Sequence, residues 1–71
     1  MTNTALLKRK ITESGYKMSY IANRLGISRQ ALAKKMHNHT EFRSSEIRGL
    51  CEILNIDAEE MRLIFFTHNV D

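Results

Sequence analysis

The chain has 71 residues, of which 42% are hydrophobic and 27% are charged, with one cysteine and no proline. A chain of this length buries only roughly 60% of its unfolded surface, so we expect a single domain over residues 1–71 rather than an enzyme with an enclosed active site. There is no apolar run of about 18 residues to cross a membrane and no apolar signal core at the N-terminus. We therefore expect a soluble, cytoplasmic protein. We also expect an all-α fold, because apolar residues recur at three-to-four spacing.

The charges are distributed unevenly along the chain. Residues 1–43 carry nine basic residues against Glu13 and Glu41, a net charge of +7, whereas residues 44–71 carry two basic residues against six acidic ones, a net charge of −4. A basic half suits a polyanion such as DNA. An acidic half is repelled by the same polyanion, so we expect it to point away from DNA or to face a protein. The alternative is that all these charges belong to ordinary solvated faces.

A first helix is expected after Asn3 or Thr4, either of which can cap it. Its apolar stripe comprises Leu6, Leu7 and Ile11. Gly15 ends the helix because glycine adopts the left-handed backbone without steric penalty. The basic residues 8–10 lie on the other sides of the helix, where we expect a solvated face.

The stretch from Met18 to Met36 predicts two short helices joined by a tight turn. Ala22 is small where the helices must cross closely, and Gly26 supplies the positive φ of the turn. Ile27 is expected to turn back into the core, and Ser28 to cap the second helix. This spacing is typical of a helix-turn-helix at about residues 18–36.

The second of these helices separates into two faces. Leu32 and Met36 are expected inside, whereas Arg29, Gln30, Ala33 and Lys34 are expected outside. Arginine pairs bidentately with guanine and glutamine with adenine in the major groove, and a short residue such as alanine can touch a thymine methyl. The alternative is that these residues are ordinary solvent-exposed helix formers.

The loop that follows contains two histidines and an asparagine. Asn38 is expected to adopt a left-handed backbone, and Phe42 to anchor the loop in the core. His37 and His39 have no carboxylate or thiolate at a ligand-like spacing, so we do not expect a metal site. A contact of His37 or Asn38 with a phosphate is the favoured interpretation.

Two further helices complete the chain. Ser44 or Ser45 is expected to cap the fourth helix, and Asp57 with Glu60 forms a capping box for the fifth. Their inward residues are expected to be Ile47, Leu50, Cys51, Leu54, Met61, Ile64 and Phe65. Phe66 either contacts another chain or packs internally with Phe65, and residues 67–71 form a frayed tail. No catalytic constellation appears anywhere, so we do not expect an enzyme.

The segment GYKMSYIANRLGISRQALAKKM, followed by a loop, a capped apolar helix and LNIDAEEM, resembles the lambda-repressor/Cro-like helix-turn-helix family, also called XRE. The resemblance covers roughly Leu6 to Phe66. KKMHNHTEFRSSEIRGLCEILNI and the ending IFF look more narrowly like Cro-like or modulator-of-repression-type proteins of temperate phages of Gram-positive bacteria. These act with a CI-type repressor in the choice between lysis and lysogeny. The resemblance implies a five-helix domain in a bacterial host cell, with the third helix in the major groove.

By position, the resemblance implies a set of DNA contacts and a set of protein contacts. Base and phosphate contacts would come from Ser28, Arg29, Gln30, Ala33 and Lys34, with His37 and Asn38 near the DNA backbone. Protein contacts, including a homodimer, would use the last helix, where Glu59, Arg62 and Phe66 are candidates. The family usually has a hydroxyl cap and a glutamine where this chain has Lys17 and Met18. Methionine cannot grip a phosphate, so Lys17 would supply charge instead.

Two hypotheses follow from the sequence. In the first, the chain is a regulator that reads double-stranded operator DNA. In the second, it is an anti-repressor that binds the DNA-binding domain of a CI-type repressor and blocks or redirects it. That partner would use either the acidic fourth and fifth helices or the basic face of the second and third helices. Neither implies a cofactor, a metal, a membrane or a small-molecule substrate.

Overall fold

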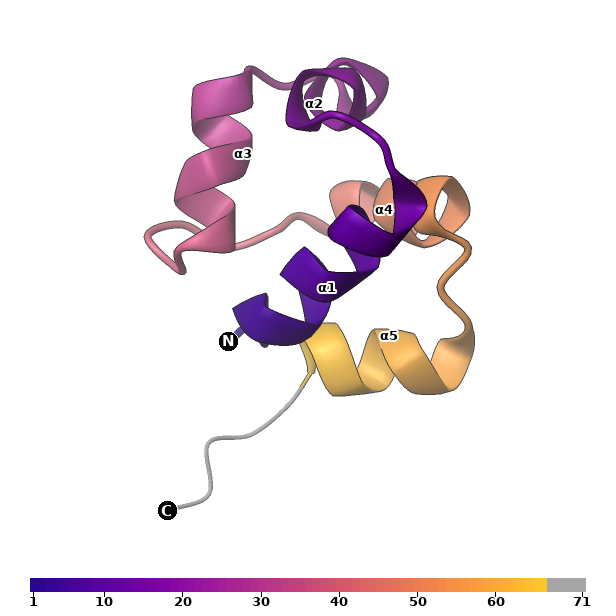
Figure 1. Cartoon of the computed structure of the whole chain (residues 1–71). Helices are drawn as coiled ribbons and strands as arrows, with labels where there is room; N and C mark the ends of the chain where they lie inside the picture. The colour runs from indigo at the N-terminus through magenta and orange to yellow at the C-terminus, as the bar shows by residue number, and fades with distance from the viewer. Residues whose placement is uncertain (67–71) are drawn as a thin grey trace.

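The computed structural model describes residues 1–66 and contains five helices in this range. They are α1 (Thr4–Ser14), α2 (Met18–Leu25), α3 (Arg29–Met36), α4 (Ser44–Leu54) and α5 (Ala58–Phe65). The described residues include no strand, so the predicted all-α, five-helix class is confirmed. In Figure 1, α2 and α5 lie at opposite ends of the molecule, α3 forms one side, and α1 crosses in front of α4.

One hydrophobic core joins the five helices. Each helix contributes residues at three-to-four spacing, which places them on one face. The predicted inward faces of the helices are confirmed by the burial of Leu7, Ile11, Leu32, Met36, Leu50, Leu54, Ile64 and Phe65. Ile21 and Ala22 of α2 are buried with them, and so is Ile56, which lies between α4 and α5. Ile27, Phe42, Ile47, Cys51 and Met61 are half-buried and pack against this core, as expected.

Local capping chemistry sets most helix ends. Asn3 rather than Thr4 caps α1, because its Oδ1 accepts a hydrogen bond from the Leu6 N–H at 3.2 Å. Gly15 and Gly26 end α1 and α2 with φ of 76° and 73°, as their sequence positions predict. The predicted capping box of α5 is present: Glu60 N–H donates to Asp57 Oδ1 at 2.8 Å, and Asp57 N–H donates to Glu60 Oε1 at 3.2 Å.

The predicted cap of α4 is wrong. The helix begins at Ser44, so neither Ser44 nor Ser45 stands at the cap position, which Arg43 occupies. The Arg43 N–H donates to Glu46 Oε1 at 2.8 Å, so a carboxylate in the first turn, rather than a serine hydroxyl, makes the side-chain hydrogen bond at the start of α4. Glu46 is 6% exposed, and the Nζ of Lys35 lies 3.4 Å from the same Oε1 atom, which helps to hold the carboxylate at the helix start.

Helices α2 and α4 approach closely at Gly49. A Cβ atom at this position would lie 2.6 Å from Leu25 Cδ2. Ala22, the other small residue of the crossing region, is 2% exposed. Gly49 and Ala22 therefore leave room for α2 to pack against α4, and α2 contacts α3 as well.

Candidate nucleic-acid interface

The turn between α2 and α3 fixes the direction of α3. Gly26 N–H donates to Asn23 O and Ile27 N–H to Ala22 O, both at 3.0 Å, so the chain leaves α2 and changes direction before α3 begins at Arg29. Ser28 Oγ then accepts from Ala31 N–H at 3.0 Å, which confirms the predicted cap of α3. The two helices contact each other through buried residues, so α3 has a defined orientation on the domain.

The outer face of α3 carries most of the residues predicted for DNA. Arg29, Gln30 and Lys34 are exposed on one short helix, and Ser28 is exposed at its N-terminal end. Ala33 differs from the expectation, because it is half-buried beside α1 and lines a groove with Met18 and Met36. The reason lies in tertiary structure: the first half of α1 runs past this side of α3, which helical periodicity within α3 does not reveal.

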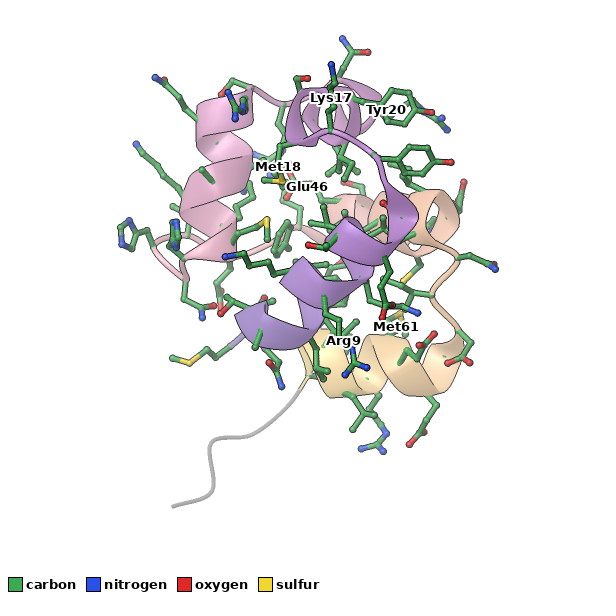
Figure 2. All side chains as sticks on the ribbon, in the orientation of Figure 1. Arg9, Lys17, Met18, Tyr20, Glu46 and Met61 are labelled. Atoms are coloured by element: carbon green, nitrogen blue, oxygen red, sulfur yellow. The ribbon has the colours of Figure 1, made fainter. Side chains whose placement is uncertain are left out.

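The start of α2 carries one charge and one apolar side chain. Lys17 occupies the cap position of α2 without a side-chain capping bond and is exposed. Figure 2 shows it pointing away from the helices. Met18 is half-buried and packs against the core. Lys17 is therefore the residue of this pair that a phosphate could reach.

The loop after α3 has a structural function of its own. Asn38 has a φ of 60°, as predicted. Its Oδ1 accepts from Thr2 N–H and its Nδ2 donates to Thr2 O, both at 3.1 Å, so the side chain holds the N-terminal segment. The exposed ring of His37 lies 6.1 Å from that of His39, centroid to centroid. Asn38 is thus already engaged within the protein, whereas His37 faces solvent.

An ion pair between α3 and α4 was not predicted from the sequence. Lys35 Nζ lies 3.4 Å from Glu46 Oε1, and the two side chains are only 13% and 7% exposed. Lys35 Nζ also donates to Glu41 O at 3.1 Å. The pair joins the last turn of α3 to the first turn of α4 and to the loop between them. Within α3, Lys35 follows Leu32 by three residues and directly precedes Met36, so its place beside this apolar stripe is the sequence feature that marks it as partly covered.

The basic residues of α1 are not a uniformly solvated face, contrary to expectation. Lys8 is exposed, and Arg9 pairs with Glu13 of the same helix at 3.3 Å. Lys10 is half-buried and bonds to Glu60 of α5 at 2.7 Å. This hydrogen bond raises the pKa of Lys10 and lowers that of Glu60. The basic and acidic halves of the chain are therefore joined by ion pairs at two places, here and at Lys35.

The residues predicted for protein contacts lie on α5. Arg62 bonds to Glu59 at 2.6 Å, which lowers the pKa of Glu59. Of the two phenylalanines, Phe65 is buried edge-on against Phe42, with ring centroids 5.6 Å apart, whereas Phe66 is 55% exposed. Leu63, which the sequence did not single out, is 43% exposed on the same helix. The predicted tail of residues 67–71 lies outside the described residues.

Comparison with known proteins returns no match: no family model, no curated protein and no solved structure matches the chain. Among residues 1–66, no helix is both long enough and apolar enough to cross a bilayer.

Proposed function

We propose that this chain is a DNA-binding transcriptional regulator of the lambda-repressor/Cro-like type, acting in the lysis–lysogeny switch of a temperate phage and reading operator DNA with α3. One observation carries the proposal. No acidic residue occurs between Glu13 and Glu41, so α2, the turn and α3 form a continuous basic region, and Arg29, Gln30 and Lys34 are exposed on it. Such a region attracts a polyanion and presents side chains suited to base edges.

Each exposed group has a distinct task in this proposal. Arg29 and Gln30 discriminate bases, each good bidentate pair contributing about 1–3 kcal/mol. Ser28, Lys34, Lys17 and His37 contact phosphates, which fix the register of the helix but carry no sequence information. Binding then weakens with salt, because each neutralised phosphate releases counterions with a log–log slope of about 0.9. Ala33 and Asn38 contribute less than the sequence implied, since the first is half-covered and the second is bonded to Thr2.

A mobility-shift titration on the promoter region next to the gene tests the proposal. Replacing Arg29 and Gln30 together by alanine is expected to lower operator affinity at least about tenfold and to abolish the preference over competitor DNA. Arg48→Ala is the matched control, because it removes an exposed arginine on α4, a helix that carries none of the proposed DNA contacts. Unchanged affinity and selectivity in the double variant would show that α3 does not read this DNA.

A second candidate is an anti-repressor that binds a CI-type repressor, and the apolar end of α5 favours it. Phe66 and Leu63 are large apolar side chains left in solvent near the C-terminal end of α5, and a contact with another chain would remove their apolar area from water. The same end of α5 suits a homodimer. Size-exclusion chromatography of the chain alone and with the co-encoded repressor separates these cases, with Phe66→Ser as the variant. If no complex elutes and the footprint of the repressor is unchanged, the anti-repressor candidate is wrong.

A further inference from the structure

A groove of about 460 Å³ opens between α1 and α3, beside the face proposed to read DNA. Its apolar lining comes from Ile11 of α1, Met18 at the start of α2, and Ala33 and Met36 of α3. Ile11 and Met36 are 7% and 8% exposed, so they belong to the core and are reached only at the bottom of the groove. Met18 is flexible and polarisable, as is typical of surfaces that adapt to a partner.

The charge at this groove is positive. Lys8 lines it beside the exposed ring of His37, and no carboxylate lines it. The groove between α1 and α5 is lined by Glu13 and Glu60, and the groove beside Phe66 is lined by Glu41. The α1–α3 groove therefore differs from these two in combining apolar walls with a basic rim.

This combination suits an acidic amphipathic helix better than it suits DNA. A phosphate placed over Met18 and Ala33 would lose water without gaining a hydrogen bond, which is unfavourable. A large apolar side chain gains from the same surface. A carboxylate on one side of that side chain would lie beside the Lys8 ammonium, whose charge is complementary, and one on the other side would lie within reach of a ring N–H of His37.

We propose that this groove binds an acidic amphipathic helix of a partner protein, with one apolar side chain of that helix seated between Met18 and Met36. The inference rests on the second candidate function and adds a contact at the α1–α3 face to the one proposed at the end of α5. Ala33 lines the groove and Lys34 follows it on α3, so a helix in the groove covers part of the DNA face. Partner and DNA are then mutually exclusive ligands.

Methionine methyl NMR tests the proposal on the intact chain. The chain has four methionines, and with ¹³C-methyl labels Met18 and Met36 report on the groove. Met61 packs between α5 and the core and Met1 borders another groove, so both serve as internal controls. The probe is a synthetic helical peptide with leucines four residues apart flanked by glutamates. Two control peptides carry lysine in place of each glutamate, or serine in place of each leucine.

We expect the acidic peptide to shift the Met18 and Met36 methyl signals and to leave Met61 unchanged, while neither control peptide binds. Lys8→Glu should weaken binding about fivefold by reversing a rim charge, whereas Arg9→Glu, the same charge change outside the groove, should not. The absence of any shift, shifts at Met61 instead, or equal shifts with the basic peptide would overturn the proposal. A separate arm with duplex DNA distinguishes the failures: a response to DNA alone overturns the groove proposal and leaves the DNA-binding function in place.

Discussion

Replacing Lys35 by methionine is expected to remove a large part of the stability of the domain. Lys35 and Glu46 are 13% and 7% exposed, so both charges are largely withdrawn from water. Removing one member of a buried pair leaves the other uncompensated and typically costs about 3–5 kcal/mol. Here Glu46 keeps the hydrogen bond from Arg43 N–H, and methionine replaces the aliphatic part of lysine. We therefore expect a cost of about 2–3 kcal/mol, against a total stability of roughly 4–11 kcal/mol for a chain of this length.

Urea unfolding followed by circular dichroism measures this cost. A double-mutant cycle with Glu46→Gln isolates the interaction, and we expect the double variant to be less destabilised than the sum of the single variants by about 1 kcal/mol or more. Arg9→Met is the matched control, because the Arg9–Glu13 pair is 73% and 59% exposed. Such a surface pair contributes at most about 0.5 kcal/mol. Equal costs for Lys35→Met and Arg9→Met, or an additive cycle, would refute the reasoning.

Three further outcomes follow from the structure, each checked by urea unfolding. Ala22→Leu should cost about 1–3 kcal/mol, because the site is 2% exposed and has no room for a larger side chain; unchanged stability would contradict this. Asn38→Ala should lower the free energy of unfolding by about 1–2 kcal/mol, since alanine disfavours the positive φ of this residue. Asn38→Gly should lower it less, because glycine adopts a positive φ freely. Equal losses in the two variants would show that the positive φ of Asn38 does not set the cost. The hydrogen bond from Lys10 lowers the pKa of Glu60, so this pair stabilises the fold above about pH 4.5 and loses its effect as the pH falls through the lowered pKa. Glu60→Gln should therefore flatten the decline in stability below about pH 4.5, and an unaltered decline would speak against the pair.

Features decided by local chemistry were predictable from the sequence. Glycine at positions 15 and 26 ends a helix because few other residues adopt a positive φ. Asp57 and Glu60 stand at the spacing at which each can bond to the other's backbone N–H. Apolar spacing placed Leu32 and Met36 inside because an eight-residue helix has one face to bury.

Features decided by neighbouring helices were not predictable in the same way. Lys35 and Glu46 lie on different helices, so nothing in the period of either helix pairs them. Ser44 and Ser45 matched the usual cap pattern, but α4 begins at Ser44 and the buried carboxylate of Glu46 accepts the Arg43 N–H. Ala33 is half-covered because α1 passes beside α3. The base contacts of Arg29 and Gln30 stay a prediction, since exposure is common to readers of DNA and to ordinary surface residues.

The short helices determine which truncations of this chain can fold. Three of them have eight residues and two have eleven, below the length of about 12–15 residues at which an isolated helix persists in water. Ile64 and Phe65 of α5 complete the core that α3 rests on, and Asn3 N–H is bonded to Ile64 O at 2.6 Å. Deleting either end would therefore unfold the region proposed to bind DNA, so loss of binding in a truncated chain would carry no information about which surface a ligand uses. Single substitutions at the surface are therefore needed to distinguish a ligand of the α3 face from a ligand of the α5 end.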